Sequence, residues 1–224
     1  MWDWVGLYSD NDQGGRVMTH SLHRDGHLED LREDFVVFTM SAKSVNAKGS
    51  AEKMRKFFQI VEKFSPVNCG DMKTGNTFNK ERDVIYDNIQ DTSIVHFVFT
   101  EEEIVREVLE ELEKADLGIS VVVSGVVDTI DELCKQAGLN MHTVELSGGI
   151  HGRLDLLPEK PILEITTMCG HGMVGGNLVK AMVEQVKKEK KSLQEAAIEL
   201  SKQCQCGIFN PKRTERLLEK FLYC

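Results

Sequence analysis

Residues 95–123 read VHFVFTEEEIVREVLEELEKADLGISVVV. The stretch begins with a strand-length run of β-branched and aromatic residues, and a second such run occupies 119–123. Between the two runs, Val105, Val108 and Leu112 recur at helical spacing and predict one apolar helix face. The stretch therefore predicts a strand, a helix and a second strand.

A similar order occurs earlier in the chain. Residues 35–40 read FVVFTM, 50–64 carry a helical apolar stripe, and 67–69 form a short candidate strand. The core would then contain two βαβ-like halves. Because strands and helices alternate, we expect an α/β fold in which helices flank a mixed or mostly parallel sheet.

The chain divides into three regions by composition. Residues 1–16 carry both tryptophans and predict an N-terminal arm, whose aromatic side chains would pack against the body or join a homo-oligomer. Residues 17–168 form the α/β core, with a last strand expected at 162–168. Residues 169–224 form a glycine-rich loop and an all-helical C-terminal segment.

The overall charge excludes some classes of partner. The 224 residues include 27 Lys and Arg against 36 Asp and Glu, a net charge of −9. Nucleic acids and anionic membranes both require a basic surface, so neither is expected as a partner. No apolar run approaches the ~20 residues of a membrane span, and a secretory signal is not expected, because Met1-Trp2-Asp3-Trp4 lacks a basic n-region. The six cysteines are therefore expected to be reduced, in a cytoplasmic protein.

The segment 168–176 reads MCGHGMVGG. Gly170, Gly172 and Gly175 match the G-x-G-x-x-G pattern of a dinucleotide-binding turn. However, such a unit needs a further strand with an acidic residue ~20 positions on, and this sequence continues into a helix instead. The glycines then predict a loop whose free N–H groups surround an anion or a metal cluster, with Cys169 at its mouth. A tight turn with a buried cysteine is the alternative.

A second cysteine motif, Cys204-Gln205-Cys206-Gly207, lies between two predicted helices. Neither of its cysteines belongs to a helical core stripe, whereas Cys134 does. Glycine follows both Cys169 and Cys206 and would let backbone N–H groups approach the sulfurs. These observations give a working hypothesis in which Cys169, Cys204 and Cys206 converge on one metal centre.

Three thiolates suit more than one centre. A [4Fe–4S] cluster with one open iron is preferred here because zinc sites usually show paired C-x₂₋₄-C or H-x₃₋₅-H spacings. Zinc with His171 or water as fourth ligand is the alternative, and Cys69 could complete either site. A redox-active thiol pair, or Cys169 as a nucleophile beside His171, is the third option.

Other residues are candidates for substrate contacts. His151 and Arg153 follow a glycine-rich turn at 147–149, and Arg153 could hold a carboxylate or phosphate. The loop 70–82 offers further polar candidates, and a run of three histidines could bind zinc if it were helical, although Asp25-Gly26 predicts a turn within it. These further candidates are Lys73, Asn76, Asn79, His20, His23 and His27.

The sequence thus predicts an enzyme whose open iron acts as a Lewis acid on a small anionic molecule held by His171, His151 or Arg153. The reaction classes are lyase, hydratase, sulfur transfer or redox. A zinc or thiol enzyme and a non-catalytic assembly or accessory protein remain as alternatives.

Overall fold

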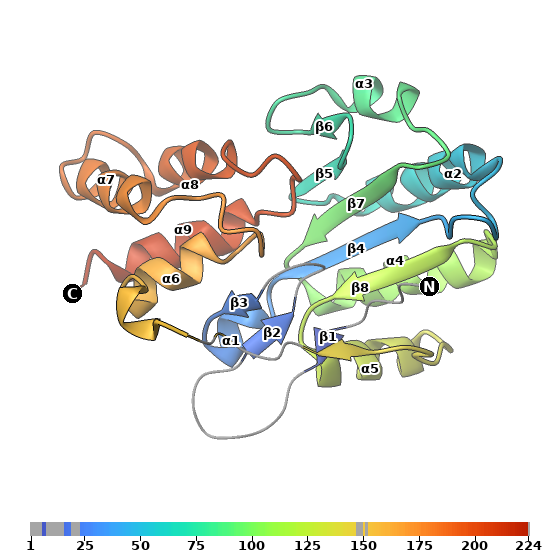
Figure 1. Ribbon diagram of the computed structural model, residues 1–224, viewed down its shortest axis with the longest axis horizontal. Coiled ribbons are helices and arrows are strands. Elements are labelled where there is room, and N and C mark those ends of the chain that lie inside the picture. The colour runs from blue at the N-terminus through green and yellow to red at the C-terminus, as the bar shows by residue number, and fades with distance from the viewer. Residues whose placement is uncertain (1–5, 8–15, 19–22, 147–149, 151, 224) are drawn as a thin grey trace.

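The computed structural model describes residues 6–7, 16–18, 23–146, 150 and 152–223. Its centre is a five-stranded sheet in the order β6-β5-β7-β4-β8 (Figure 1). Two smaller ladders, β1 with β9 and β2 with β3, lie below it in this view. The strands are β1 (Gly6–Leu7), β2 (Arg16–Met18), β3 (His23–Asp25), β4 (Phe35–Met40), β5 (Asn68–Asp71), β6 (Gly75–Asn76), β7 (Ile94–Phe99), β8 (Ser120–Ser124) and β9 (Glu145–Leu146).

The helices fall into two groups. One group packs on the sheet and the other, α6 to α9, gathers at one end of the molecule (Figure 1). The helices are α1 (Leu28–Leu31), α2 (Ser50–Val61), α3 (Arg82–Asp87), α4 (Glu102–Ala115), α5 (Val127–Gln136), α6 (Lys160–Thr166), α7 (Gly176–Lys187), α8 (Leu193–Ser201) and α9 (Pro211–Lys220), with short 3₁₀ turns at Glu62–Phe64 and Leu154–Leu156.

The strand directions correct one expectation. Strands and helices alternate as predicted, but every pair in the central sheet is antiparallel, so the expectation of a mixed or mostly parallel sheet is wrong. The units β4-α2-β5 and β7-α4-β8 are each split: β7 lies between β4 and β5, and β4 lies between β7 and β8. This is a split βαβ arrangement, in which each crossover passes over an antiparallel strand of the other unit.

The two faces of the sheet have different neighbours. Phe35 and Val37 on β4, with Phe97 on β7, pack against α2, α4 and α5 in the main core. Val36 and Val98 point to the opposite face, where they meet Ile208 from the loop between α8 and α9. The period of two along each strand therefore separates a helix-covered face from a face that receives the C-terminal segment.

The helices α6 to α9 share a second core, which also contains Cys169 and Cys204. The strand expected at 162–168 is wrong, because most of it is α6. Pro161 lies in the first turn of this helix, where its fixed backbone angle is favourable. Ile162 and Ile165 then lie three residues apart on one buried face. No helix in the described ranges has the length and apolar character needed to cross a bilayer.

Candidate metal centre

Three cysteines from two separate segments meet between α6, α8 and α9. Cys169 lies in the loop after α6, and Cys204 and Cys206 lie in the turn after α8. The Sγ atoms of Cys204 and Cys206 are 3.3 Å apart. The Sγ of Cys206 is 3.4 Å from Nδ1 of His171, and the Cys169 thiol hydrogen-bonds with Cys204, Cys206 and His171. The structure thus brings together the three cysteines and the histidine named from the sequence.

The burial of these four side chains differs. Cys169 and Cys204 are fully buried, whereas Cys206 and His171 are partly exposed. Hydrogen bonds from Cys204 and then Cys206 lower the pKa of the Cys169 thiol. The same contact with Cys169 raises the pKa of Cys204 to about 11 and raises that of Cys206. The cluster therefore holds one negative charge readily, and a further thiolate requires a cation beside it.

Backbone N–H groups also approach each sulfur. The N–H of Met173 hydrogen-bonds to Cys169, that of Ile208 to Cys206, and that of Phe209 to Cys204. Gly170 follows Cys169 and Gly207 follows Cys206, and both glycines have a φ of +76°. That left-handed conformation turns the chain back toward the sulfur, as the sequence analysis proposed for these glycines. Such N–H groups stabilise thiolate charge around a metal.

The turn at 204–207 is anchored to the sheet. Nδ2 of Asn76 donates to the carbonyl oxygens of Cys204 and Gln205, at 3.3 and 3.1 Å, and Asn68 donates to that of Gly207. A Cβ on Gly207 would lie 2.4 Å from the Cβ of Asn76 and 2.8 Å from Nε2 of His96. The cysteine turn is therefore pressed against β6 and β7.

His96 is fully buried on β7, and burial lowers its pKa to about 4. The nearby backbone of Gly207 and Ile94 and the carboxylate of Asp71 offset this only in part. Neither ring nitrogen makes a hydrogen bond of good geometry in the described residues. Asn68 and His96 are not among the residues that the sequence motifs indicate. The sequence signal that could have identified them is alternation. Asn68 and His96 each lie between two apolar residues in a predicted strand, so their side chains point away from the main core.

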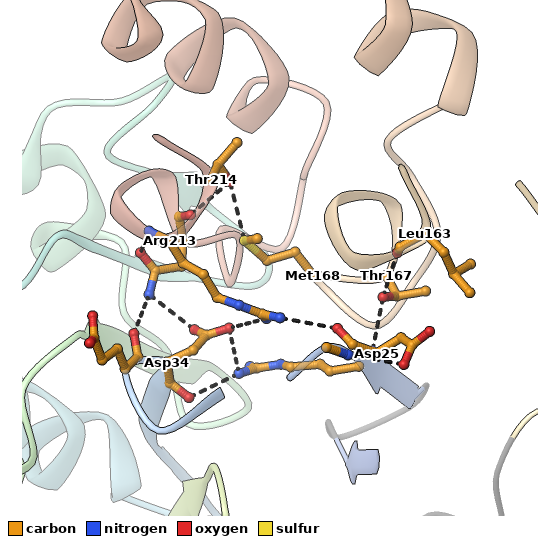
Figure 2. A network of polar contacts seen from close by, with 11 residues as sticks. Asp25, Asp34, Leu163, Thr167, Met168, Arg213 and Thr214 are labelled. Atoms are coloured by element: carbon orange, nitrogen blue, oxygen red, sulfur yellow. Dashed lines mark hydrogen bonds and ion pairs between the residues drawn. The ribbon is translucent and has the colours of Figure 1, made fainter. Parts of the chain in front are cut away.

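A buried charge network lies beside the cysteine loop (Figure 2). Oδ2 of Asp34 accepts from Arg24 at 3.1 Å and from Arg213 at 3.0 Å, and Arg213 also donates to the carbonyl of Asp25. Oδ1 of Asp34 accepts from Asn210, the N-cap of α9. Figure 2 shows Arg213 reaching between Asp34 and Asp25. No sequence motif indicates this network, because Arg213 and Asp34 lie 179 positions apart in the chain.

The remaining cysteines lie elsewhere. Cys69 is on β5 in the main core, paired with Phe97, and burial raises its pKa to about 11. It therefore faces away from Ile208 and the cysteine turn, across the sheet. Cys134 is in the main core on α5, as expected, and Cys224 lies outside the described residues.

Of the other sequence candidates, Asn76 reaches the cysteine turn, and the structure does not bring the remaining described ones to the cysteines. Arg153 is exposed and bonds Asp155, and His27 is exposed with Nε2 3.9 Å from Glu164. Lys73 contacts Thr92, and Oδ1 of Asn79 accepts from the N–H of Asn76. His23 begins β3, where it pairs with Met18, whereas His20, His151 and the turn at 147–149 lie outside the described residues.

The glycine pattern at 170–175 follows a helix. Because α6 precedes it, the strand-to-helix turn of a dinucleotide site is absent at Gly170, Gly172 and Gly175 within the described structure. Gly175 is instead the N-cap of α7.

The four donors touch one another without surrounding a common point. In the part of the chain that the structure describes, no three His, Cys, Asp or Glu side chains are already arranged as metal ligands. A metal ion would require the thiols to turn about their Cα–Cβ bonds, which is a small movement for side chains already in contact. Comparison with protein families, with curated proteins and with solved structures gives no match to this chain.

Proposed function

We propose that this chain is a metal-binding protein that holds one zinc ion through Cys169, Cys204, Cys206 and His171. The observation that carries the proposal is the mutual contact of these four donors, together with a backbone N–H at each sulfur. Three thiolates and one imidazole are a frequent donor set of tetrahedral zinc sites.

The spacing of the sulfurs favours one ion over a cluster. Zn–S bonds of about 2.3 Å place the sulfurs of a tetrahedral site about 3.8 Å apart. Cysteine sulfurs on one [4Fe–4S] cluster lie roughly 6–7 Å apart, because each binds a different iron. The separation of 3.3 Å between Cys204 and Cys206 is near the first value and about half the second. We therefore prefer zinc to the cluster that the sequence analysis favoured.

The role we propose for the ion is to fasten the fold. Four protein ligands fill a tetrahedral site, which is the arrangement of structural zinc. The ligands join the loop after α6 to the turn after α8, and that turn carries Ile208 onto the sheet. Exposure of His171 leaves a route to catalysis, in which water replaces the imidazole and the ion acts as a Lewis acid on a small anion.

The test is the metal content of the full chain and of single variants. The wild-type protein purified with zinc should contain about one zinc per chain, and Co²⁺ in its place should give the charge-transfer bands of a thiolate-rich tetrahedral site. Cys169→Ser, Cys204→Ser and Cys206→Ser should each lose most of the metal. Cys134→Ala is the matched control, because Cys134 is buried away from the site, and it should keep the full content.

Two outcomes would overturn the zinc proposal. One is a folded wild-type protein that binds no zinc, or that loses it equally in Cys134→Ala. The other is an anaerobic preparation that contains iron and sulfide and is brown, which would support the [4Fe–4S] centre instead. His171→Gln separates the two roles of the ion. Strong loss of zinc supports a structural ligand, whereas retained zinc with a water ligand supports the catalytic role.

A further inference from the structure

Two arginines are buried beside the cysteines and share one carboxylate. Arg24 and Arg213 are both buried, with side-chain exposures of 1% and 0%, and they share the single carboxylate of Asp34. Arg24 also donates to the backbone carbonyl of Asp34 at 3.2 Å through the same nitrogen, Nη1. One whole edge of its guanidinium, Nε and Nη2, has no acceptor in the described structure. A buried guanidinium edge without an acceptor is costly unless an anion lies beside it.

No second carboxylate pairs with Arg24 in the described structure. Glu164 is another buried acid near Arg213, but it faces His27, and burial raises its pKa. Asp25 gives Arg213 its backbone carbonyl, and its own Oδ1 accepts from the N–H of Gly26. Nε and Nη2 of Arg24 therefore have no anion of their own among the described residues.

The two arginines lie close to the cysteine loop. The N–H of Asp25, next to Arg24, donates to Oγ1 of Thr167, two residues before Cys169. Arg213 follows Cys206 by seven residues and lies in the first turn of α9, where Thr214 donates to the sulfur of Met168 (Figure 2). Burial lowers the pKa of Arg24, while Asp34, Cys169 and Cys206 act in the opposite direction. Arg24 thus interacts with two of the three sulfurs through its charge.

We propose that Arg24 is the counter-ion of the thiolate metal centre and sets its affinity for the metal. The inference rests on the proposed function. A divalent ion held by three thiolates and a neutral imidazole carries one negative charge, and the edge of Arg24 that has no acceptor offers the opposite charge. Arg24 acts as a positioning residue that does not ligate the ion. The pairing places opposite charges together in a region from which water is excluded.

The counter-ion role makes opposite predictions for the loaded and the metal-free protein. Arg24→Met should weaken zinc binding about 10–100-fold, the usual effect of losing an outer partner of a metal ligand. Without metal, Nε and Nη2 of Arg24 have no acceptor in the described structure, and the same substitution removes that unsatisfied buried edge. The remaining Asp34–Arg213 pair is balanced, so the metal-free variant should be at least as stable as the metal-free wild type.

Two further variants, Arg24→Lys and Cys206→His, separate the effect of the Arg24 charge from the effect of its packing. Arg24→Lys keeps the charge and should keep zinc affinity within a few-fold of the wild type. Cys206→His replaces one thiolate with a neutral imidazole and removes the negative charge of the centre. In that background Arg24→Met should change the zinc affinity much less than it does beside three thiolates.

The measurement is zinc affinity by competition with a chelator, together with denaturant unfolding of the metal-free full-length variants. Arg106→Met is the control, because Arg106 pairs with Glu103 and Glu110 on the surface of α4 and should change neither quantity appreciably. If wild type binds zinc and Arg24→Met binds it equally well, the counter-ion role is wrong and the zinc site stands. Two further results would overturn the counter-ion role. One is that Arg24→Met lowers zinc affinity equally in the wild-type and in the Cys206→His background. The other is that Arg24→Met lowers the free energy of unfolding of the metal-free protein by as much as it lowers the free energy of zinc binding.

Discussion

Gly207 is held in a left-handed turn between the Cys206 thiol and the edge of the sheet. Its φ is +76°, and an added Cβ would meet Asn76 at 2.4 Å and His96 at 2.8 Å. Left-handed backbone in a non-glycine residue costs about 1–2 kcal/mol, and overpacking adds about 1–3 kcal/mol. Gly207→Ala should therefore reduce the free energy of unfolding by about 2–5 kcal/mol. It should also weaken metal binding, because the turn that presents the N–H of Ile208 to Cys206 would move.

Gly138 offers a matched control for this prediction. It has the same φ of +76°, but a Cβ there would find nothing within 4 Å. Gly138→Ala should lose only the conformational part, about 1–2 kcal/mol, and keep its metal. Denaturant unfolding and metal content of both variants test the idea, and equal losses in both would show that crowding at the cysteine turn contributes nothing.

His96 makes the stability depend on pH. Its pKa is about 4 in the folded chain, against an ordinary value of 6.5. Between these values the unfolded chain binds more protons than the folded one, so stability falls as the pH drops from about 6.5 to 4. The contribution is complete above pH 6.5 and amounts to at most about 3 kcal/mol.

His96→Gln provides the comparison for this pH dependence. The variant keeps the proposed metal ligands, so acid release of the metal affects both proteins alike. Unfolding free energies measured at pH 7 and pH 5 should fall less in His96→Gln than in the wild type. Parallel falls would mean that His96 is not buried in its neutral form.

At the scale of the elements, local patterns identified the main strands and helices of the sheet domain but neither the pairing of the strands nor α6. The runs at 35–40 and 95–100 do become β4 and β7, and the stripe at 50–64 becomes α2 and the turn after it. The sequence of one strand does not show whether its neighbour is parallel or antiparallel. Val37 and Phe38 point to opposite faces of the sheet in either case. A split crossover and a direct one therefore give the same order of strands and helices.

The error at α6 has a different cause. Ile162, Ile165 and Thr166 are β-branched, and such residues favour strands on a half-buried surface. In the fold they pack on α7 and α9 instead, and the tertiary context overrides the local preference. The signal that indicated the helix was Pro161 near its start, which is unusual inside a strand.

The cysteines could be found from sequence because they lie in turns that need no thiol for folding. The residues around them could not. Asn68 meets Gly207 across 139 positions, and Arg213 meets Asp34 across 179. Such contacts depend on how the C-terminal helices pack on the sheet, and the spacing of residues within one segment does not predict that packing. The candidate site was therefore predictable in its donors and not in its surroundings.

At the scale of the whole molecule, the cysteine turn joins two cores. Its sulfurs belong with α6 to α9, whereas Ile208 belongs with the second face of the sheet. The main core between the sheet and α2, α4 and α5 shares no residue with either cluster. Loss of a metal at the turn should then loosen the C-terminal helices without unfolding the main core.

Removal of the metal by a chelator tests this separation through amide hydrogen exchange. Exchange should become faster in α7, α8, α9 and the turn at 204–209, and it should change little in α2, α4 and β7, because metal binding stabilises the part that it holds together. The same chelator should have no further effect on Cys169→Ser, which lacks the site from the outset. Uniform acceleration over the whole chain would mean that the two cores unfold as one unit. An unchanged pattern in the wild type would mean that the cysteine turn is held without a metal, by Asn68, Asn76 and Ile208 alone.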